Sequence, residues 1–216
     1  MPGSWPLFGL RLSCGEVSLQ PVCEADLDEL AGMLPDDYEH DPASVLLPEL
    51  DLDANRRRLL RQTYWRAWGT WSVDSWKLPF RVAHDGRLVG VQALEADHFP
   101  DLRTVDSSSW LDSDCRRRGI GTAMRTAILA LAFDHLGAQA AVTSARHDNL
   151  ASLGVSRRLG YRDNGVSMTR SPTGPCQLRH MRLTRDDWVA SSWGDSVTLT
   201  GIEPCAPYFG IDLGPR

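Results

Sequence analysis

A basic, glycine-containing stretch at residues 116–122 is the part of the sequence best suited to chemistry. It reads Arg-Arg-Arg-Gly-Ile-Gly-Thr and stands between an apolar strand-like segment and a long helical pattern. The start of a helix presents N–H groups without intrahelical partners and the positive end of the helix dipole. Glycine lets a diphosphate approach the backbone, and arginine adds charged donors. The spacing therefore predicts a phosphate-binding loop.

Three phosphate-binding motifs compete for this stretch. A P-loop ends in Gly-Lys-Ser/Thr, but here Gly121 is followed directly by Thr122. A dinucleotide fingerprint requires Gly or Ala three residues after its second glycine, where Met124 stands. The pyrophosphate loop Arg/Gln-x-x-Gly-x-Gly/Ala of enzymes that use coenzyme A fits from Arg116 to Gly121. A solvated basic turn before a core helix is the structural alternative.

The surrounding elements alternate between strands and helices. Alternating and short apolar runs predict strands at residues 10–12, 17–19, 80–84, 88–94, 104–111, 140–144, 161–169 and 177–184. Asp85-Gly86 predicts a two-residue hairpin turn of the primed type. Helical spacing predicts helices at 24–33, 53–68 and 119–136, and from Asp148 or Asn149 to 159. The strand at 140–144 should run parallel to its predecessor, because a helix connects them.

The predicted helix 53–68 carries a stripe whose role the sequence leaves open. Asp53 is the expected N-cap, and Leu60, Tyr64 and Trp68 share one face. Core packing is the simpler interpretation. The alternative is that one of three aromatic residues lines an acceptor pocket: Tyr64, Trp65 or Trp68.

The element order predicts an α/β protein with a mixed, mostly antiparallel sheet rather than a long doubly wound one. Residues 1–9 form an N-terminal arm, and residues 10–188 form one domain. Residues 189–216 show little periodicity and three prolines. They are predicted to form a C-terminal tail that wraps the domain or a neighbouring subunit.

Several short motifs along residues 10–188 resemble the GNAT superfamily of N-acetyltransferases, and more closely its RimJ/RimL-like branch. The motifs are Asp26-Leu27, Leu88-Val89-Gly90, Ser109-Trp110-Leu111, Arg118-Gly119-Ile120-Gly121-Thr122, Asn149-x-x-Ser152 and Leu159-Gly160-Tyr161. The resemblance implies a GNAT-type fold in which two adjacent parallel strands splay apart and acetyl-CoA inserts between them. That branch acetylates protein N-termini and many small amines.

The resemblance also implies site roles. The pantetheine arm pairs with the strand edge near Trp110 and Leu111, and a backbone N–H near Leu111 polarises the thioester carbonyl. Asn149 fixes the cofactor arm, and Ser152 meets the leaving thiolate; a first-turn helix cap is the structural alternative for Ser152. The diphosphate contacts Arg116, Arg117, Arg118, Gly119, Ile120, Gly121 and Thr122. Many relatives carry a tyrosine acid where this chain has Ser156.

Three residues are candidates for the general base. Glu95 ends a strand beside the expected acceptor site and is the first candidate, followed by Asp106 and then His98. Each is also explained as an ordinary polar residue at a strand end. Cys115 precedes the arginines, but no histidine near it in sequence supports a nucleophile.

Composition limits the classes of partner and cofactor that the protein is expected to have. The formal net charge is −5, which argues against a general nucleic-acid binder. Five widely spaced cysteines without Cys-x-x-Cys indicate neither a disulfide framework nor a zinc site, and no metal is expected. No apolar run spans a bilayer and no signal peptide begins the chain, so a cytoplasmic protein without membrane contact is expected. Domains of this branch often pair, which leaves a homodimer open.

The leading hypothesis is direct acetyl transfer from acetyl-CoA to a primary amine of a protein N-terminus, a lysine or a small molecule such as an antibiotic. A degenerate domain that binds acyl-CoA and regulates without turnover is the first alternative, motivated by the missing tyrosine. O-acylation, or transfer of a longer acyl group, is the second.

Overall fold

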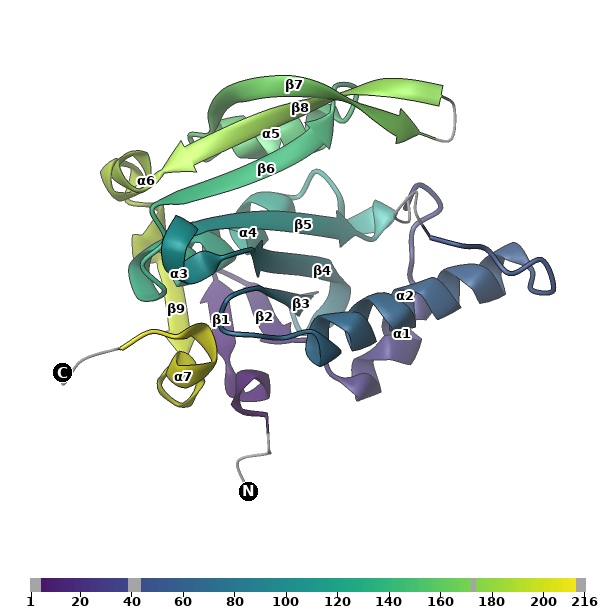
Figure 1. The fold of residues 1–216 in the computed structure, drawn as a ribbon, viewed down its shortest axis with the longest axis horizontal. Coiled ribbons are helices and arrows are strands. Elements are labelled where there is room, and N and C mark those ends of the chain that lie inside the picture. Colours follow the sequence, from purple (N-terminus) through teal and green to yellow (C-terminus); the bar gives the residue numbers. More distant parts are fainter. Residues whose placement is uncertain (1–4, 39–43, 172–173, 213–216) are drawn as a thin grey trace.

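The computed structural model describes residues 5–38, 44–171 and 174–212. In these residues nine strands form one sheet in the order β7-β8-β6-β5-β4-β3-β2-β1-β9 (Figure 1). The strands are β1 Arg11–Cys14, β2 Val17–Pro21, β3 Trp76–His84, β4 Arg87–Ala96, β5 Thr104–Leu111, β6 Ala140–Arg146, β7 Arg162–Ser171, β8 Gly174–Thr184 and β9 Val197–Thr200. The helices are α1 Leu27–Gly32, α2 Leu52–Gly69, α3 Phe99–Leu102, α4 Ile120–Ala130, α5 Leu150–Arg158, α6 Arg185–Ser191 and α7 Ala206–Phe209.

The only parallel neighbours among the described strands are β5 and β6, which confirms the predicted parallel pair. They are connected through α4, and they pair only at Thr104–Ala140 and Val105–Ala141. Beyond these pairs β5 continues to Leu111 alongside β4, whereas β6 pairs with β8 along its whole length. The sheet therefore splits between β5 and β6 and leaves one backbone edge of β5 open.

Helix α4 packs against one face of the sheet. Its apolar stripe is buried, including Ile120, Met124, Ala127 and Ile128, as the 3.6-residue spacing predicts. The last predicted turn is a π-helical segment, Leu131–His135, and Gly137 leaves it with a φ of 75°. The predicted helix therefore exists, but its final turn is wider than an α-helix.

Helices α1 and α2 lie together and form a second apolar cluster with β4 (Figure 1). Leu60 and Tyr64 are buried in this cluster and Trp68 packs against it, so the stripe is core packing. The predicted N-cap was wrong: the side chain of Asp51 accepts from the Ala54 N–H at 2.8 Å. Asp53 lies in the first turn and pairs with Arg57 instead.

The hairpin between β3 and β4 confirms the predicted turn and brings β4 close to β5. Asp85 and Gly86 have φ values of 51° and 77°, as a primed turn requires. Farther along β4, a Cβ on Gly90 would lie 2.3 Å from the carbonyl oxygen of Trp110. Only glycine permits this approach of β4 to the end of β5.

The C-terminal segment adds a strand that its weak periodicity did not predict. Strand β9 pairs antiparallel with β1, with Leu199 opposite Leu12. Ile202, Cys205 and Phe209 are buried in the core that contains α4. The segment packs on its own domain in this structure. No helix among the described residues is long and apolar enough to cross a bilayer.

Candidate active site

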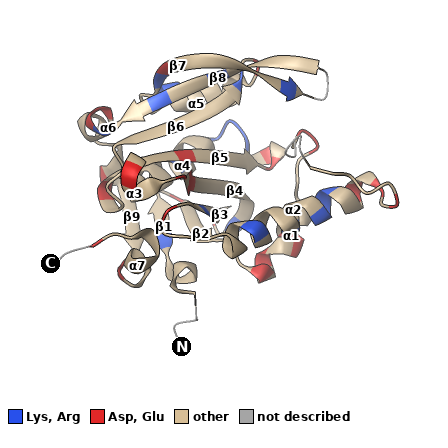
Figure 2. Ribbon diagram, viewed as in Figure 1, with Lys and Arg blue, Asp and Glu red and all other residues tan. Residues whose placement is uncertain are grey.

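The loop before α4 has the backbone of an anion-binding turn. Arg117 and Gly119 both have positive φ, 61° and 81°, whereas Arg118 between them does not. Alternation of this kind turns successive N–H groups toward one side and makes a concave nest for anions. The side chains of Arg117 and Arg118 are exposed. Figure 2 shows a blue loop beside α4, between β5 and β6.

Gly121 occupies the space where α4, β5 and α5 approach one another. A Cβ built there would meet the Val155 Cγ2 at 3.5 Å and the Leu111 Cδ1 at 4.0 Å. The first turn of α4 therefore packs closely on the side chains of Leu111 and Val155. A helix start, a nest and two exposed guanidinium groups suit a diphosphate.

Arg116 has a different environment from the two arginines that follow it. Its guanidinium donates to both carboxylate oxygens of Asp37, at 2.6 and 2.7 Å, and to the Leu111 carbonyl at 3.2 Å. This contact lowers the pKa of the Asp37 carboxyl below its usual value. The Arg116 side chain, a predicted cofactor ligand, thus joins the segment before α2 to the end of β5.

The other face of β5 carries the acidic groups. Opposed residues of an antiparallel pair share a face, and Glu95 lies opposite both Lys77 and Asp106. The Lys77 Nζ lies 2.8 Å from the Glu95 carboxylate and 3.5 Å from the Ser108 hydroxyl. The two leading candidates for the base are therefore neighbours on β4 and β5.

Asp106 and Glu95 differ in their burial and in the charges beside them. Burial raises the pKa of Asp106, and the nearby negative charge of Glu95 raises it further. The Ser107 N–H donates to the Asp106 carboxylate at 2.6 Å and opposes the shift. Glu95 instead has a cationic partner, Lys77. The raised pKa makes Asp106 the better of the two candidates to accept a proton.

The third candidate for the base lies apart from this pair. His98 precedes α3, and its Nδ1 is 3.0 Å from the Asp74 carboxylate on an exposed turn. Cys115 is buried in the loop before α4. Among the described residues, neither His98 nor Cys115 makes a hydrogen bond or ion pair with Asp106.

Two aromatic rings lie near the far end of the same face of β5. The Tyr38 and Trp110 rings meet edge to face with centroids 6.0 Å apart, and Trp110 packs on the cluster of α1 and α2. Trp65 is exposed, and its Nε1 donates to Glu24 at 2.8 Å. Tyr38 was not singled out from the sequence, because it lies in an aperiodic acidic segment.

The start of α5 confirms one of the two predicted caps. The Asn149 side-chain oxygen accepts from the Ser152 N–H at 3.1 Å, so Asn149 is the N-cap. Ser152 is half-buried one turn along the helix. Ser156 is buried and donates to the Ser152 carbonyl at 3.1 Å.

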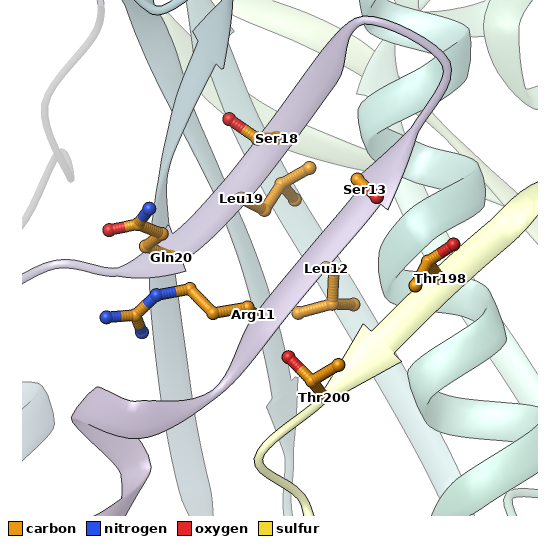
Figure 3. A pocket seen from close by; sticks show the side chains of 8 residues that line it. All are labelled: Arg11, Leu12, Ser13, Ser18, Leu19, Gln20, Thr198 and Thr200. Atoms are coloured by element: carbon orange, nitrogen blue, oxygen red, sulfur yellow. The ribbon is translucent and has the colours of Figure 1, made fainter.

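A hollow elsewhere on the sheet contains none of the predicted site residues. It lies over β1, β2 and β9 (Figure 3) and is lined mainly by polar side chains: Arg11, Ser13, Ser18, Gln20, Thr198 and Thr200. The candidate active site is therefore defined by the split between β5 and β6 rather than by this hollow.

The split sheet, the basic loop and the capped α5 define an acyl-CoA-binding fold. A sequence profile of the acetyltransferase (GNAT) domain matches residues 16–162, so the chain belongs to this family. It is therefore an acetyl-CoA-dependent N-acetyltransferase, as the sequence predicted.

Three solved structures share the fold. Mycobacterium smegmatis RimJ in complex with CoA-disulfide has 18% identity and a TM-score of 0.67, covering 84% of this chain and 92% of that one. RimL, a ribosomal L7/L12 α-N-protein acetyltransferase, has 14% identity and a TM-score of 0.62, covering 78% of this chain and 90% of that one. A chimera of spermidine N-acetyltransferase SpeG from Vibrio cholerae and hSSAT has 11% identity and a TM-score of 0.63, covering 81% of this chain and 98% of that one. These neighbours confirm the GNAT fold.

Proposed function

We propose that this protein acetylates a primary amine and that Asp106 takes the proton from the amine. The observation that carries the proposal is the carboxyl pair of Asp106 and Glu95 on the face of β5 opposite α4. Two adjacent carboxyl groups attract an ammonium group, and the raised pKa of Asp106 suits it to accept a proton.

The cofactor is held from the opposite side. The N–H groups of residues 116–122 and the side chains of Arg117 and Arg118 bind the diphosphate. The open edge of β5 at Trp110 and Leu111 pairs with the pantetheine arm as an added strand would. Asn149 and Ser152 border the same arm from α5. Acetyl-CoA supplies the acetyl group as an activated thioester.

Transfer is direct in this arrangement. The deprotonated amine approaches from the acidic face, and a backbone N–H on the open edge of β5 stabilises the charge that develops on the thioester oxygen. Ser152 donates a hydrogen bond to the departing sulfur; a serine hydroxyl is too weak an acid to protonate a thiolate fully. Glu95, which is paired with Lys77, is the second carboxylate beside Asp106.

The acceptor class follows from the same surface. The acidic pair and the edge-to-face rings of Tyr38 and Trp110 favour a cationic amine on an extended chain. The named activities of the structural neighbours, on a protein α-amino group and on spermidine, fit this chemistry. We propose a peptide N-terminus or a polyamine as the acceptor.

A thiol-release assay tests the proposal. Acetyl-CoA is offered with N-terminal peptides, spermidine and a matched alcohol, beside calorimetric titration of CoA. Binding with amine-dependent release supports the proposal, and release with the alcohol alone would indicate O-acylation. CoA binding without release for any amine would favour the regulatory alternative. Absence of CoA binding would contradict the assigned loop.

A further inference from the structure

Three hydrogen-bonded polar side chains cross the half of the sheet that lies beyond the split. They are Ser144 on β6, His180 on β8 and Ser167 on β7, three strands that adjoin in this order (Figure 1). The Ser144 hydroxyl lies 2.8 Å from the His180 Nδ1, and the Ser167 hydroxyl lies 2.8 Å from the His180 Nε2. We call these three side chains the serine–histidine row, and the transfer described above makes no use of them.

The row lies on the same face of the sheet as Asp106. Thr104 on β5 pairs with Ala140 on β6, and paired residues of neighbouring strands project to the same face. Asp106 is two residues beyond Thr104, and Ser144 is four residues beyond Ala140, so both keep that face. Thr143 projects to the other face, where its hydroxyl contacts an arginine of α4. An amine at Asp106 and the row therefore share one surface, on the two sides of the split.

The row is open to solvent and has the length of a short peptide. Ser144 and Ser167 are exposed, and His180 is half-buried between them. The row spans two strand spacings, about 10 Å, which an extended chain covers with about three residues at roughly 3.3 Å each. A chain that begins at Asp106 and continues across β6 therefore passes over the row with its first few residues.

The hydrogen bonds within the row determine what it offers to a ligand. A neutral imidazole has one N–H donor and one acceptor nitrogen. One serine hydroxyl therefore accepts from the ring of His180 and keeps its own O–H free to donate. The other donates its O–H to the ring and keeps only acceptor lone pairs. In either tautomer the row presents one donor and one acceptor, which complement the C=O and the N–H of a peptide backbone. A protonated polyamine has donors but no acceptor.

The charges on this surface also distinguish a peptide from a polyamine. Arg182 is two residues from His180 on β8, so it projects from the same face, and it is exposed. The carboxyl groups of Asp106 and Glu95 lie on the other side of the split. The surface is therefore acidic where the amine is held and basic beside the row. A polyamine would bring a second ammonium group toward Arg182, whereas a peptide backbone has its only positive charge at the N-terminus.

We propose that the serine–histidine row binds the first peptide units of an acceptor whose α-amino group lies at Asp106. The protein then acetylates peptide N-termini in preference to polyamines. Ser144 and Ser167 contact the acceptor backbone, and His180 is a positioning residue that fixes the direction of both hydroxyl groups. This inference rests on the proposed function, because it requires the amine to react beside Asp106.

Steady-state thiol release at saturating acetyl-CoA tests the inference. The acceptors are an alanine tetrapeptide amide with a free N-terminus and spermidine. Wild type should have a kcat/KM for the peptide at least about 10-fold above that for spermidine. His180→Phe keeps a ring but removes both nitrogens, and it should raise the peptide KM by about 10-fold, as expected for two weakened hydrogen bonds. The peptide kcat and the kcat/KM for spermidine should change by less than about twofold. His180→Gln retains a donor and an acceptor and should restore part of the peptide affinity.

Single hydroxyl deletions separate recognition from folding. Ser144→Ala and Ser167→Ala change exposed positions, and each should raise the peptide KM by several-fold, which keeps the inference testable if His180→Phe does not fold. Thr198→Val, the control, removes an exposed hydroxyl at the opposite edge of the sheet and should change neither acceptor.

The outcomes distinguish this inference from the proposed function. A wild type that prefers spermidine, or row variants with an unchanged peptide KM, would overturn the inference alone. Equal losses with the peptide and with spermidine would also overturn it, because they would indicate a structural role for the row. Absence of thiol release with both amines would overturn the proposed function as well.

Discussion

Replacement of Asp106 by asparagine separates a catalytic role from a structural one. Asparagine has the same shape, and its side-chain oxygen can still accept from the Ser107 N–H, a bond of 2.6 Å in the native protein. It cannot take a proton from an amine. A positioned general base contributes a factor of roughly 100 to 10,000, so we expect kcat for amine acetylation to fall by about that much in Asp106→Asn.

The stability of the same variant should move in the opposite direction. Burial and Glu95 raise the pKa of Asp106 in the folded protein, which means that folding disfavours its ionised form. The stability contribution of such a group is full below its unfolded pKa and is lost as pH rises through the folded pKa. Asparagine never ionises, so Asp106→Asn should have an equal or higher Tm than wild type at pH 8.

The assay is thiol release at saturating acetyl-CoA between pH 5 and 9, with a Tm at each pH. Wild type should show an acid limb with a pKa above the usual aspartate value, and Asp106→Asn should lose that limb. Asp163→Asn, an exposed change on β7, is the matched control. A rate within threefold of wild type would refute the base assignment. A markedly lower Tm would indicate a structural role instead.

Substitutions at four further positions test the rest of the site. Gly121→Glu should weaken CoA binding by more than 100-fold by calorimetry, whereas Gly121→Ala should fold normally, since its Cβ meets neighbours at ordinary contact distances; retained binding by the glutamate variant would refute the loop. Asn149→Ala loses the cap on α5 and should cost about 0.5–2 kcal/mol in urea unfolding, with weaker CoA binding; an unchanged rate would place the cofactor arm elsewhere. Ser152→Ala should lower kcat more than CoA affinity, and a selective rise in KM would make it a binding residue only. Gly90→Ala would place a Cβ 2.3 Å from the Trp110 carbonyl and should destabilise by about 1–3 kcal/mol; equal urea midpoints would contradict that packing.

The elements that position the site could be predicted because their signals are local. The apolar period of residues 119–136 describes a helix with one buried face, and Asp85-Gly86 satisfies a primed turn by itself. The cap at Asn149 uses an oxygen three residues from its donor. Such features need no knowledge of the rest of the chain.

The contacts that distinguish the site residues are long-range, and sequence spacing does not encode them. Arg116 pairs with Asp37, 79 residues away. A motif with three adjacent arginines does not reveal which of them has a distant acidic partner. Asp51 and Asp53 are equally good caps by residue type, and only helix packing selects Asp51. Strand β9 has four residues and pairs at the sheet edge, which is too short for a periodic signal.

The alternation of side chains along β5 explains why one strand can serve both substrates. Val105, Ser107 and Leu111 face α4, where the cofactor loop and the buried Arg125 lie. Asp106, Ser108 and Trp110 face the acidic and aromatic surface formed with β4 and α1. In the proposed arrangement, a thioester that pairs with the open edge of β5 lies between these two faces. The amine can then reach the thioester from one face while the cofactor is bound from the other, so no residue of the protein has to act as a nucleophile.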